Sequence, residues 1–488
     1  MHHTLHRAFL DHGRVRADAP LALPTALILA LSSALLLALS SAAMLLTLGA
    51  APAAALSFAP ASHSFAGLSP VALAVGDFNG DGRPDVATAN TRGHTVGVLL
   101  GIGRGRLATR VPYGTGMGPR SVAVGDFDGD GHQDLAVANG GEATVSVLLG
   151  DGDGRFARRQ HLGVGPSPAA VAVGDFNGDG DQDLVSADYD RTDGTASVLL
   201  GDGAGGFAPR IVVPTGPNSY DIAVGDFDRD GRQDLATVFT DFFADQGVGV
   251  LMGDGTGHFS SMTTHGTYLE PVAIAIGDLN ADGRQDLVAA QRQKGSGELG
   301  VFLGDDVFRF RGGISLQIEP EILCVALGDL NSDGRQDVAT AKGRSAVVLR
   351  GDGQGGLTKL LTFPVGAHPA DVAIADFNRD GLPDLATADA AEDSVSVLLN
   401  GPAAAPVLRT LSPGQGRVGA VVTLTGIRVG LKRGAGVVRF GGATATSYVS
   451  WSSTKIRVRV PAGTAWGWVQ ATVRTVAGTS ASKSFRRP

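Results

Sequence analysis

The feature that most constrains this chain is one segment that recurs seven times. A clear copy reads Ser121-Val-Ala-Val-Gly-Asp-Phe-Asp-Gly-Asp-Gly-His-Gln-Asp-Leu-Ala-Val-Ala-Asn139. The first loop aspartates of successive copies are 49, 49, 51, 52, 51 and 47 residues apart. Such a period is typical of propellers and solenoids, in which each repeat buries its apolar surface against its neighbours.

Each copy has the pattern of β-strands and not of helices. Apolar residues alternate at Val122 and Val124, at Leu135 and Val137, and again over residues 145–149. A period of two indicates strands, and alanine, serine and glycine occupy the intervening positions. Glycine contributes 71 of the 488 residues and aromatics only 6%, so small side chains must fill much of the core. This pattern suits sheets packed closely on both faces, as propeller blades are.

The two ends of the repeat array complement each other. An apolar residue lies nineteen positions before the first aspartate of every copy and marks the start of a strand. The seventh copy ends at Asn400 without this strand, whereas one starting at Phe58 precedes the first copy. We therefore predict an all-β, seven-bladed β-propeller in which residues 58–67 complete the blade containing residues 395–399. A linear solenoid is the alternative, but it would expose two open sheet edges and would more naturally carry distinct capping repeats.

Within each copy, nine residues follow the pattern Asp-x-[Asp/Asn]-x-Asp-Gly-x-x-Asp, and we number them as loop positions 1 to 9. Calcium takes about six to eight oxygen ligands, and side chains at positions 1, 3, 5 and 9 can converge on it because glycine at position 6 permits a sharp turn. Position 7 should contribute only its backbone carbonyl oxygen, which explains its variable side chain. The residues predicted to bind about seven calcium ions are Asp77, Asn79, Asp81, Arg83, Asp85, Asp126, Asp128, Asp130, His132, Asp134, Asp175, Asn177, Asp179, Asp181, Asp183, Asp226, Asp228, Asp230, Arg232, Asp234, Asp278, Asn280, Asp282, Arg284, Asp286, Asp329, Asn331, Asp333, Arg335, Asp337, Asp376, Asn378, Asp380, Leu382 and Asp384.

Two other interpretations of this loop fit the sequence less well. An EF-hand needs glutamate at position 12 and flanking helices, whereas position 12 here holds residues such as Thr88, Val137 and Ser186. Asp-Gly and Asn-Gly pairs also form simple β-turns, but a turn requires no acid at positions 1 and 9. All seven copies keep a carboxylate or amide at all four side-chain positions, which favours calcium in a strand–loop–strand setting.

The charge of the chain divides along its length. The total is −8, and because residues 1–55 carry +1 and residues 401–488 carry +13, the middle carries −22. The four side-chain ligand positions hold 23 carboxylates, so the negative charge of the middle is essentially that of the predicted metal sites. This division of charge indicates three separate regions of the chain, residues 1–55, 56–401 and 402–488, with different electrostatic roles.

Residues 1–55 have the composition of an export signal. A weakly basic start precedes an apolar stretch from Leu21 to Leu48, and Ala53-Ala54-Ala55 offers a small-residue cleavage site. The stretch is also long enough to cross a bilayer, so an uncleaved N-terminal anchor is the alternative. Both interpretations predict a secreted or cell-surface, extracytoplasmic protein of a bacterium. The single cysteine, Cys324, excludes an internal disulfide and a thiolate zinc site.

Residues 58–400 resemble the FG-GAP (VCBS-type) repeats of integrin α-subunit propellers and of many bacterial surface proteins. The resemblance implies the propeller fold, calcium in the loops, and ligand binding on the face opposite those loops. That face would be built by the variable connectors, such as residues 188–195, 240–247 and 291–298. Aromatic residues in or beside such segments are candidate recognition anchors, although packing of loop tips would also explain them: Tyr113, Tyr189, Tyr220, Tyr268, Phe242 and Phe243.

Residues 402–488 carry no calcium loop and have Val-rich strands separated by glycine turns. Leu411-Ser412-Pro413, Phe440-Gly441-Gly442 and Val460-Pro461 resemble the IPT/TIG domain, which implies an immunoglobulin-like β-sandwich. Thirteen basic residues and no acid suit an anionic partner: an acidic polysaccharide, a membrane surface or the acidic propeller itself. A basic sandwich that is merely soluble and has no such partner is the alternative. Trp466 and Trp468 could stack on sugars, and we expect one of the two to point inward. We expect no nucleic-acid partner, because the export signal argues against a nuclear role.

The sequence contains no nucleophile elbow, zinc-binding histidine pair or phosphate loop. We therefore expect a non-catalytic, calcium-stabilised interaction or adhesion protein that binds a protein or glycan ligand. The alternative is a secreted polysaccharide-degrading enzyme, a lyase or hydrolase on a propeller scaffold. Long catalytic insertions would favour an enzyme, and the connectors differ by only five residues in length.

Overall fold

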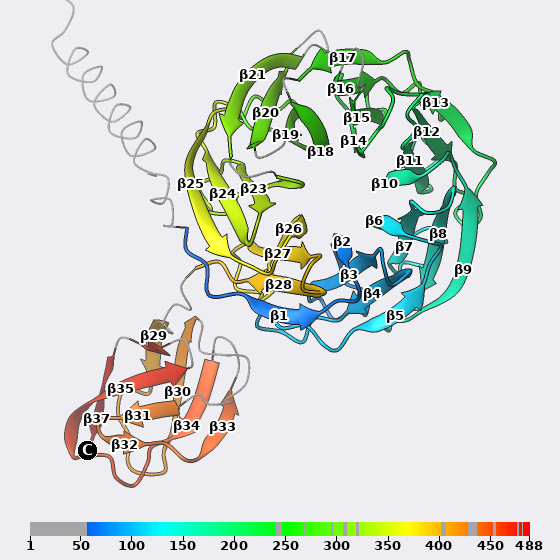
Figure 1. Cartoon of the computed structure of the whole chain (residues 1–488). Coiled ribbons are helices and arrows are strands. Elements are labelled where there is room, and N and C mark those ends of the chain that lie inside the picture. Colours follow the sequence, from blue (N-terminus) through cyan, green and yellow to red (C-terminus); the bar gives the residue numbers. More distant parts are fainter. Residues whose placement is uncertain are drawn as a thin grey trace, which may run out of the picture. The chain divides into compact units, whose positions relative to one another are not determined.

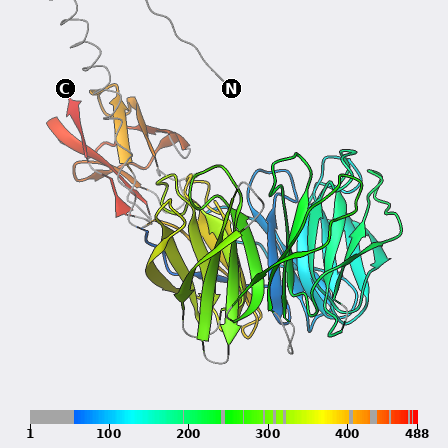
Figure 2. The same ribbon diagram turned by 90° about the horizontal axis from the view of Figure 1, so that it is seen from above.

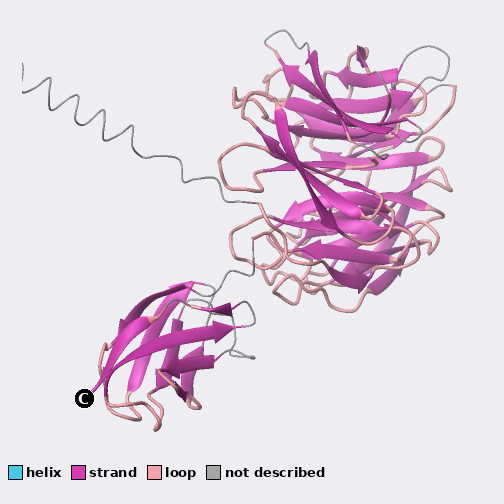
Figure 3. Cartoon of the chain, turned by 60° about the vertical axis from the view of Figure 1, so that its left-hand side comes forward, coloured by secondary structure: helices cyan, strands magenta, loops and turns pink. Residues whose placement is uncertain are grey.

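The computed structural model describes residues 56–192, 194–240, 246–267, 269–293, 296–305, 310–318, 322–401, 407–427, 437–451, 455–475, 478–480 and 482–488. The predicted export signal, residues 1–55, lies outside this part of the chain. Every regular element in the described residues is a β-strand (Figure 3). Among the same residues, no helix is long and apolar enough to span a membrane.

The repeats form seven four-stranded antiparallel sheets, which stand around a ring in Figure 1 and are seen edge-on in Figure 2. We call them blades 1 to 7. This is the predicted all-β propeller. The strands of the successive blades are β2 (Pro70–Gly76), β3 (Asp85–Asn90), β4 (Thr95–Leu99) and β5 (Val111–Gly114); β6 (Pro119–Gly125), β7 (Asp134–Asn139), β8 (Thr144–Gly150) and β9 (Phe156–Gly163); β10 (Pro168–Gly174), β11 (Asp183–Asp188), β12 (Thr195–Leu199) and β13 (Ile211–Pro214); β14 (Asp221–Gly225), β15 (Asp234–Thr240), β16 (Gln246–Leu251) and β17 (Thr263–Gly266); β18 (Glu270–Gly277), β19 (Asp286–Gln293), β20 (Ser296–Gly304) and β21 (Phe310–Gln317); β22 (Val325–Gly328), β23 (Asp337–Lys342), β24 (Ser345–Gly351) and β25 (Leu357–Pro364); β26 (Pro369–Ala375), β27 (Asp384–Asp389) and β28 (Ser394–Leu398) with β1 (Ser62–Phe65).

The middle strands of each blade are buried on both faces. In blade 2, all six residues of β7 are buried. The apolar clusters form between neighbouring blades, so that Ala87 and Ala89 of blade 1 pack in one cluster with Leu135 and Val137 of blade 2. Small side chains facing larger ones let the two sheets approach closely. The alternation of alanine with larger apolar residues therefore reflects sheets covered on both sides, as predicted.

The first strand of the ring domain completes the last blade. β1 pairs antiparallel with β28, over Ser62–Phe65 and residues 394–397. Upstream of this ladder, Phe58 forms a β-bridge with Asn400. The Phe58 ring packs edge-on against that of Phe363, with 4.7 Å between the ring centroids. The two ends of the repeat array thus share one sheet, which confirms the predicted closure.

Two aspartates tie the inner strands of neighbouring blades. Asp371 Oδ1 accepts the N–H of Val372 at 2.8 Å, and its Oδ2 accepts the N–H of Leu73 in blade 1 at 2.9 Å. Asp221 acts in the same way between blades 4 and 5, where its Oδ2 accepts the N–H of Ile274 at 2.9 Å. Burial raises the pKa of Asp371 to about 6 and that of Asp221 to about 7. Each carboxylate gives a partner to N–H groups at a sheet edge, and Asp371 does so across the closure.

The described residues between 407 and 488 form a β-sandwich, as predicted from the IPT/TIG resemblance. Its core includes Val422, Leu424 and Ile456, together with Phe440 and Phe485, whose rings pack edge-on at 5.0 Å. The strands of its two sheets are β29 (Val407–Ser412), β30 (Val421–Ile427), β34 (Lys455–Arg459) and β33 (Tyr448–Trp451) in one, and β32 (Ala443–Thr444), β31 (Val437–Phe440), β35 (Gly467–Thr475) and β36 (Gly478–Thr479), with β37 (Lys483–Arg487) paired to β35, in the other.

Removing β1 should weaken the whole ring. A chain starting at Leu68 lacks the ladder between β1 and β28 and leaves β28 as an open edge, whereas a chain starting at Leu56 keeps it. If the ladder contributes about 3–5 kcal/mol, the shorter chain should melt on the order of 5–10 °C lower, because Tm shifts by about 2 °C per kcal/mol in a large domain. Thermal unfolding of the two chains measures the difference. Equal melting temperatures would contradict a ring closed by β1.

Candidate functional site

The predicted metal loops all lie at one end of the blades. In blade 2, β6 ends at Gly125, position 1 of the loop is Asp126, and position 9 is Asp134, the first residue of β7. Gly125 and Asp134 are register partners, so the hairpin brings positions 1 and 9 back together. The connectors between second and third strands fall at the other end of the blades. One face of the ring therefore carries the repeated loops, and the opposite face carries the variable connectors.

Two backbone positions in each loop have left-handed geometry. Position 6 is glycine in all copies, with φ between 73° and 92°, a conformation that glycine adopts without steric cost. Position 4 has φ between 57° and 73° in all copies and is glycine in only three of them. The other four copies place Arg229, Ala281, Ser332 or Arg379 in this strained region. The contacts of the loop must therefore impose its shape.

Side chains of the loop supply those contacts. Asp126 Oδ2 accepts the N–H of Gly131 at 3.0 Å, and Asp130 Oδ1 accepts the N–H of His132 at 2.8 Å. The equivalent bonds, to the N–H groups of positions 6 and 7, occur in the other six copies at 2.7–3.1 Å. These bonds fold the turn and hold the carboxylates of positions 1 and 5 on it.

The carboxylate at position 9 is buried and joins the loop to the third strand of its blade. Asp134 Oδ2 accepts the N–H of Phe127 in the loop at 2.8 Å, and Oδ1 accepts the N–H of Gly150 at the end of the third strand at 2.7 Å. The bond to the end of the third strand recurs in all seven copies at 2.6–3.0 Å. Hydrogen bonds to a charged acceptor are stronger than neutral ones. Position 9, predicted as a metal ligand, thus also joins the loop to the third strand, a role that the motif does not reveal.

Burial makes these position 9 carboxyls hard to ionise. It raises the pKa of Asp85, Asp134, Asp234 and Asp337 to about 6 and that of Asp384 to about 8. Backbone hydrogen bonds oppose the rise, whereas neighbouring carboxylates of the same loop add to it. A cation beside these groups would favour their ionised form. The loops therefore concentrate negative charge that lacks full compensation from the protein itself.

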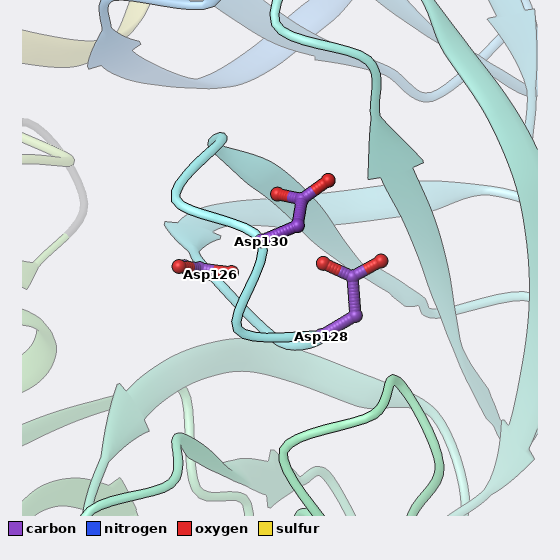
Figure 4. A group of neighbouring side chains, drawn as sticks. All are labelled: Asp126, Asp128 and Asp130. Atoms are coloured by element: carbon purple, nitrogen blue, oxygen red, sulfur yellow. The ribbon is translucent and has the colours of Figure 1, made fainter.

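The residues present fit a hard cation. Asp126, Asp128 and Asp130 each offer a carboxylate oxygen, and the three oxygens lie within 4.8 Å of one another (Figure 4). Positions 1, 3 and 9 of the loop in blade 4 form a second such group. Asp126 Oδ1 and Asp128 Oδ1 are buried without a hydrogen-bond partner, which is costly unless something else satisfies them. An all-oxygen set of this kind is what calcium and magnesium prefer, so these acidic clusters can hold a metal ion.

In other copies the predicted ligands also make contacts within the loop. The position 3 amides of Asn177 and Asn280 donate to the position 5 carboxylates at 2.7 and 3.1 Å. The position 7 guanidinium groups of Arg83 and Arg284 pair with their position 5 carboxylates at 2.6 and 3.0 Å. These pairs are partly exposed to solvent and contribute little. In these two copies they give the position 7 side chain a charge-compensating role beside its predicted carbonyl.

Position 8 of the loop links neighbouring blades, and the predicted ligand set omits it. Gln133 Oε1 in blade 2 accepts the N–H of Asp77, position 1 of blade 1, at 2.7 Å. Gln182, Gln233 and Gln285 accept the corresponding N–H of the preceding blade at 2.8–2.9 Å. The signal was present in the sequence, because position 8 is glutamine in five of the seven copies. Each of these loops is therefore fixed to its neighbour as well as to its own blade.

On the opposite face, four partly exposed side chains from blades 3, 4 and 5 form what we call the rim cluster: Tyr189, Tyr220, Glu270 and Arg292. The rings of Tyr189 and Tyr220 lie 5.2 Å apart between centroids. Tyr220 Oη donates to Glu270 Oε1 at 2.7 Å. Arg292 donates to both oxygens of Glu270, from Nη2 at 3.1 Å and from Nε at 3.3 Å. Its guanidinium carbon also lies 5.6 Å from the centre of the Tyr220 ring.

Within the rim cluster, the pKa of Tyr220 is raised and that of Glu270 is lowered. Burial, and then the Glu270 carboxylate, raise the pKa of Tyr220, so its phenol remains a hydrogen-bond donor. Burial opposes ionisation of Glu270, but hydrogen bonds from Arg292 and Tyr220 hold the pKa of Glu270 below its ordinary value. The cluster therefore presents aromatic surface, a carboxylate and a guanidinium in one fixed arrangement, which can both stack on a ligand and hydrogen-bond to it.

The rim cluster departs from the repeat. The positions equivalent to Tyr220 hold Val71, Arg120, Ala169, Val272, Leu323 and Ala370. The tyrosines were predicted anchors, whereas Glu270 and Arg292 were not, because their contact depends on the register between β18 and β19. Tyr113 packs edge-on against Phe156 in blade 2 and takes no part. Tyr268, Phe242 and Phe243 lie outside the described residues.

Family comparisons agree with this architecture. The model of the FG-GAP-like repeat matches residues 77–137, 126–186, 175–237, 278–340 and 329–387, and that of the IPT/TIG domain matches residues 406–486. No curated protein sequence matches the chain significantly.

Several solved structures are similar at low sequence identity. The BP39L lectin from Burkholderia pseudomallei has a TM-score of 0.52 and 15% identity, covering 70% of this chain and 96% of its own. A structure of BBS1N in complex with ARL6DN gives 0.49 and 12%, covering 70% and 96%. An Agrocybe aegerita structure, described as recognising non-reducing terminal N-acetylglucosamine, gives 0.43 and 18%, covering 67% and 86%. At such identity, the first similarity supports the fold alone. With its repeats matched over more than half of its length, the chain belongs to the FG-GAP-like repeat proteins and carries a C-terminal IPT/TIG domain.

Proposed function

We propose that this protein is a non-catalytic, calcium-stabilised binding protein, secreted or held at the cell surface, whose propeller binds a protein or glycan on the face opposite the metal loops. FG-GAP-like repeats and an IPT/TIG domain indicate an extracellular protein of the adhesion or binding type. The observation that carries the proposal is the division of the ring into one face of repeated acidic loops and another with the non-repeated rim cluster.

The chemistry of the loops favours calcium over magnesium. Calcium accepts irregular sets of about six to eight oxygens, whereas magnesium demands a near-octahedral set and usually keeps several waters. The loops offer carboxylates, amides and a backbone carbonyl on a tightly turned segment. Seven calcium ions would change the charge of the middle region from −22 to −8 and remove much of the self-repulsion that weakens a compact state. In this account the metal is structural, because the loops face away from the rim cluster.

The rim cluster supports a ligand that is both ring-like and polar. Tyrosine and arginine are enriched in the residues that dominate binding energies at interfaces. The pair of Tyr189 and Tyr220 offers aromatic surface, and Glu270 with Arg292 offers acceptors and donors in a fixed orientation. Sugar hydroxyls and peptide side chains can both use such a set.

Calcium should raise the melting temperature, and single-loop variants should separate the two roles of the carboxylates. Filling one site of affinity ~10⁻⁴–10⁻³ M at about 10 mM calcium stabilises by about 1.4–2.7 kcal/mol. Asp128→Ala should therefore lower Tm on the order of 2–5 °C in calcium and leave it unchanged in chelator. Asp134→Ala should lower Tm in both conditions, because it also removes the hydrogen bonds that join the loop to the third strand. His132→Ala is the matched control and should behave as wild type. Identical wild-type melting in calcium and in EGTA would contradict calcium binding.

Acidification should stabilise the metal-free protein and weaken its response to calcium. The pKa values of five position 9 carboxyls, about 6 to 8, lie above the ordinary value of about 3.9, and burial also raises those of Asp183 and Asp286. The folded state then binds more protons, so its stability rises as pH falls from 8 to 5. Asp221 and Asp371, whose pKa values are also raised, add to this gain in stability at low pH. The stabilisation by calcium should shrink as pH falls, because protons compete with the metal for the carboxylates. Melting of metal-stripped protein across this range tests the sign. A metal-free Tm that falls steadily with acidification would contradict it.

Substitutions in the rim cluster should weaken ligand binding without unfolding the ring. A glycan array and a panel of surface proteins would first identify a ligand for the wild-type chain in calcium. Tyr189→Ala and Arg292→Ala should then weaken binding at least about tenfold, as expected for anchor residues. Arg120→Ala, at the position of blade 2 equivalent to Tyr220, is the matched control and should bind normally. Unchanged binding by both rim variants would move the site elsewhere, and release of reducing sugar from a bound glycan would contradict a non-catalytic protein.

A further inference from the structure

Two tryptophans of the C-terminal domain are the most exposed large apolar side chains among the described residues. Trp466 is 72% and Trp468 is 69% exposed. The expectation that one of them points inward is wrong, because both are exposed. Trp466 lies in the bend before β35, and Gly467, with a φ of 84°, separates it from Trp468, so the two do not alternate along one strand. Val469, the next residue, points into the core. Tryptophan exposed to this extent is unusual unless it serves an interface.

Trp466 is held in place by an arginine. The guanidinium carbon of Arg487 lies 4.1 Å from the centre of the Trp466 ring, well within the range of a cation–π contact. Arg487 Nη1 also donates to the carbonyl oxygen of Thr464. The guanidinium is thus fixed between the ring and the preceding turn, so Trp466 projects from a defined position.

Trp468 lies on a polar, basic sheet surface. β35 and β37 pair antiparallel (Figure 1), with Trp468 opposite Arg486 and Gln470 opposite Ser484. Directly opposed residues share a face of the sheet, and these four are all exposed. Gln470 Nε2 donates to Ser484 Oγ at 3.4 Å. Trp466 and Arg487 lie at the end of the same two strands, beside the pair of Gly467 and Arg487. We call this strand end, together with the face that carries Trp468, Gln470, Ser484 and Arg486, the Trp–Arg surface.

We propose that the Trp–Arg surface binds an acidic polysaccharide, with the indoles stacking on sugar rings and the arginines pairing with carboxylate or sulfate groups. Charge complementarity points to an anionic occupant, because residues 402–488 contain thirteen basic residues and no acid. Arginine recognises planar anions through paired donors. This site does not rest on the ligand of the propeller, since it lies in another domain.

The neighbours of the tryptophans favour a polysaccharide over a membrane. A surface that enters a bilayer surrounds its tryptophans with large apolar residues. Here the exposed neighbours on the sheet are Gln470, Ser484 and Arg486. Such groups can hydrogen-bond to sugar hydroxyls on a polymer lying along the sheet, whereas they would lose their water partners inside a lipid interface.

Binding of the chain from residue 56 onward, in calcium, to polygalacturonate and heparin tests the proposal, with dextran as the neutral polymer. The wild type should bind both polyanions and not dextran, and its tryptophan emission should change on binding. The double variant Trp466→Ala with Trp468→Ala keeps every charge and should lose at least about tenfold in affinity, because aromatic anchors dominate such contacts. Both side chains are largely exposed, so Tm should be unchanged.

The control variant, Lys455→Ala with Arg457→Ala, removes two charges from the other sheet and should weaken binding by no more than about threefold, through long-range charge alone. Equal binding by the tryptophan variant and the wild type would overturn the proposal. Failure of the wild type to bind either polyanion at about 150 mM salt would do so as well. Binding to phosphatidylglycerol vesicles, with a blue shift of tryptophan emission and no polyanion binding, would assign the surface to a membrane instead. The rim variants Tyr189→Ala and Arg292→Ala should bind both polyanions as the wild type does, and loss of polyanion binding in them would overturn the proposal.

Discussion

The ring depends on a buried carboxylate repeated seven times. The position 9 aspartate, exemplified by Asp134, accepts one N–H from its own loop and another from the end of the third strand. It therefore fixes the hairpin and the third strand at one point in six blades, whereas in blade 7 the N–H of Phe377 donates to the carbonyl oxygen of Ala375 instead. Burial raises the pKa of this residue, and the other carboxylates of the loop add to the rise. One group thus couples the geometry of the blade to the charge of the loop, and any cation bound there acts on both.

This coupling explains how a protein with one cysteine can build a large ring from small residues. Alanine and valine let adjacent sheets approach closely, but such packing buries little area per side chain. The remaining constraints are polar. Gln133 ties the loop of blade 2 to blade 1, Asp371 bridges blades 7 and 1, and β1 completes blade 7. These contacts act together with the apolar cluster between blades 7 and 1, which includes Leu73 and Val397.

Much of this architecture could be predicted because it repeats. Strand alternation, loop spacing and the displaced strand at Phe58 are each visible in the sequence, and each has the predicted place in the fold. What could not be predicted depends on contacts between blades or across a register. Glu270 and Arg292 are 22 residues apart and meet only because β18 and β19 pair as they do. Trp466 and Trp468 are both exposed because Trp466 lies in a bend before β35, which begins at Gly467, so the alternation expected for a strand does not include both residues.

The most direct test of this account is the calcium content of the folded protein. Metal-stripped chain from residue 56 onward would be equilibrated with millimolar calcium, and its bound metal would be counted by dialysis and elemental analysis. If the loops act as proposed, about seven ions should bind per chain at these concentrations, and magnesium should not replace them at equal concentration. A folded protein that retains no calcium would show that the acidic loops are only turns, and it would contradict the link between metal and ring on which the account rests.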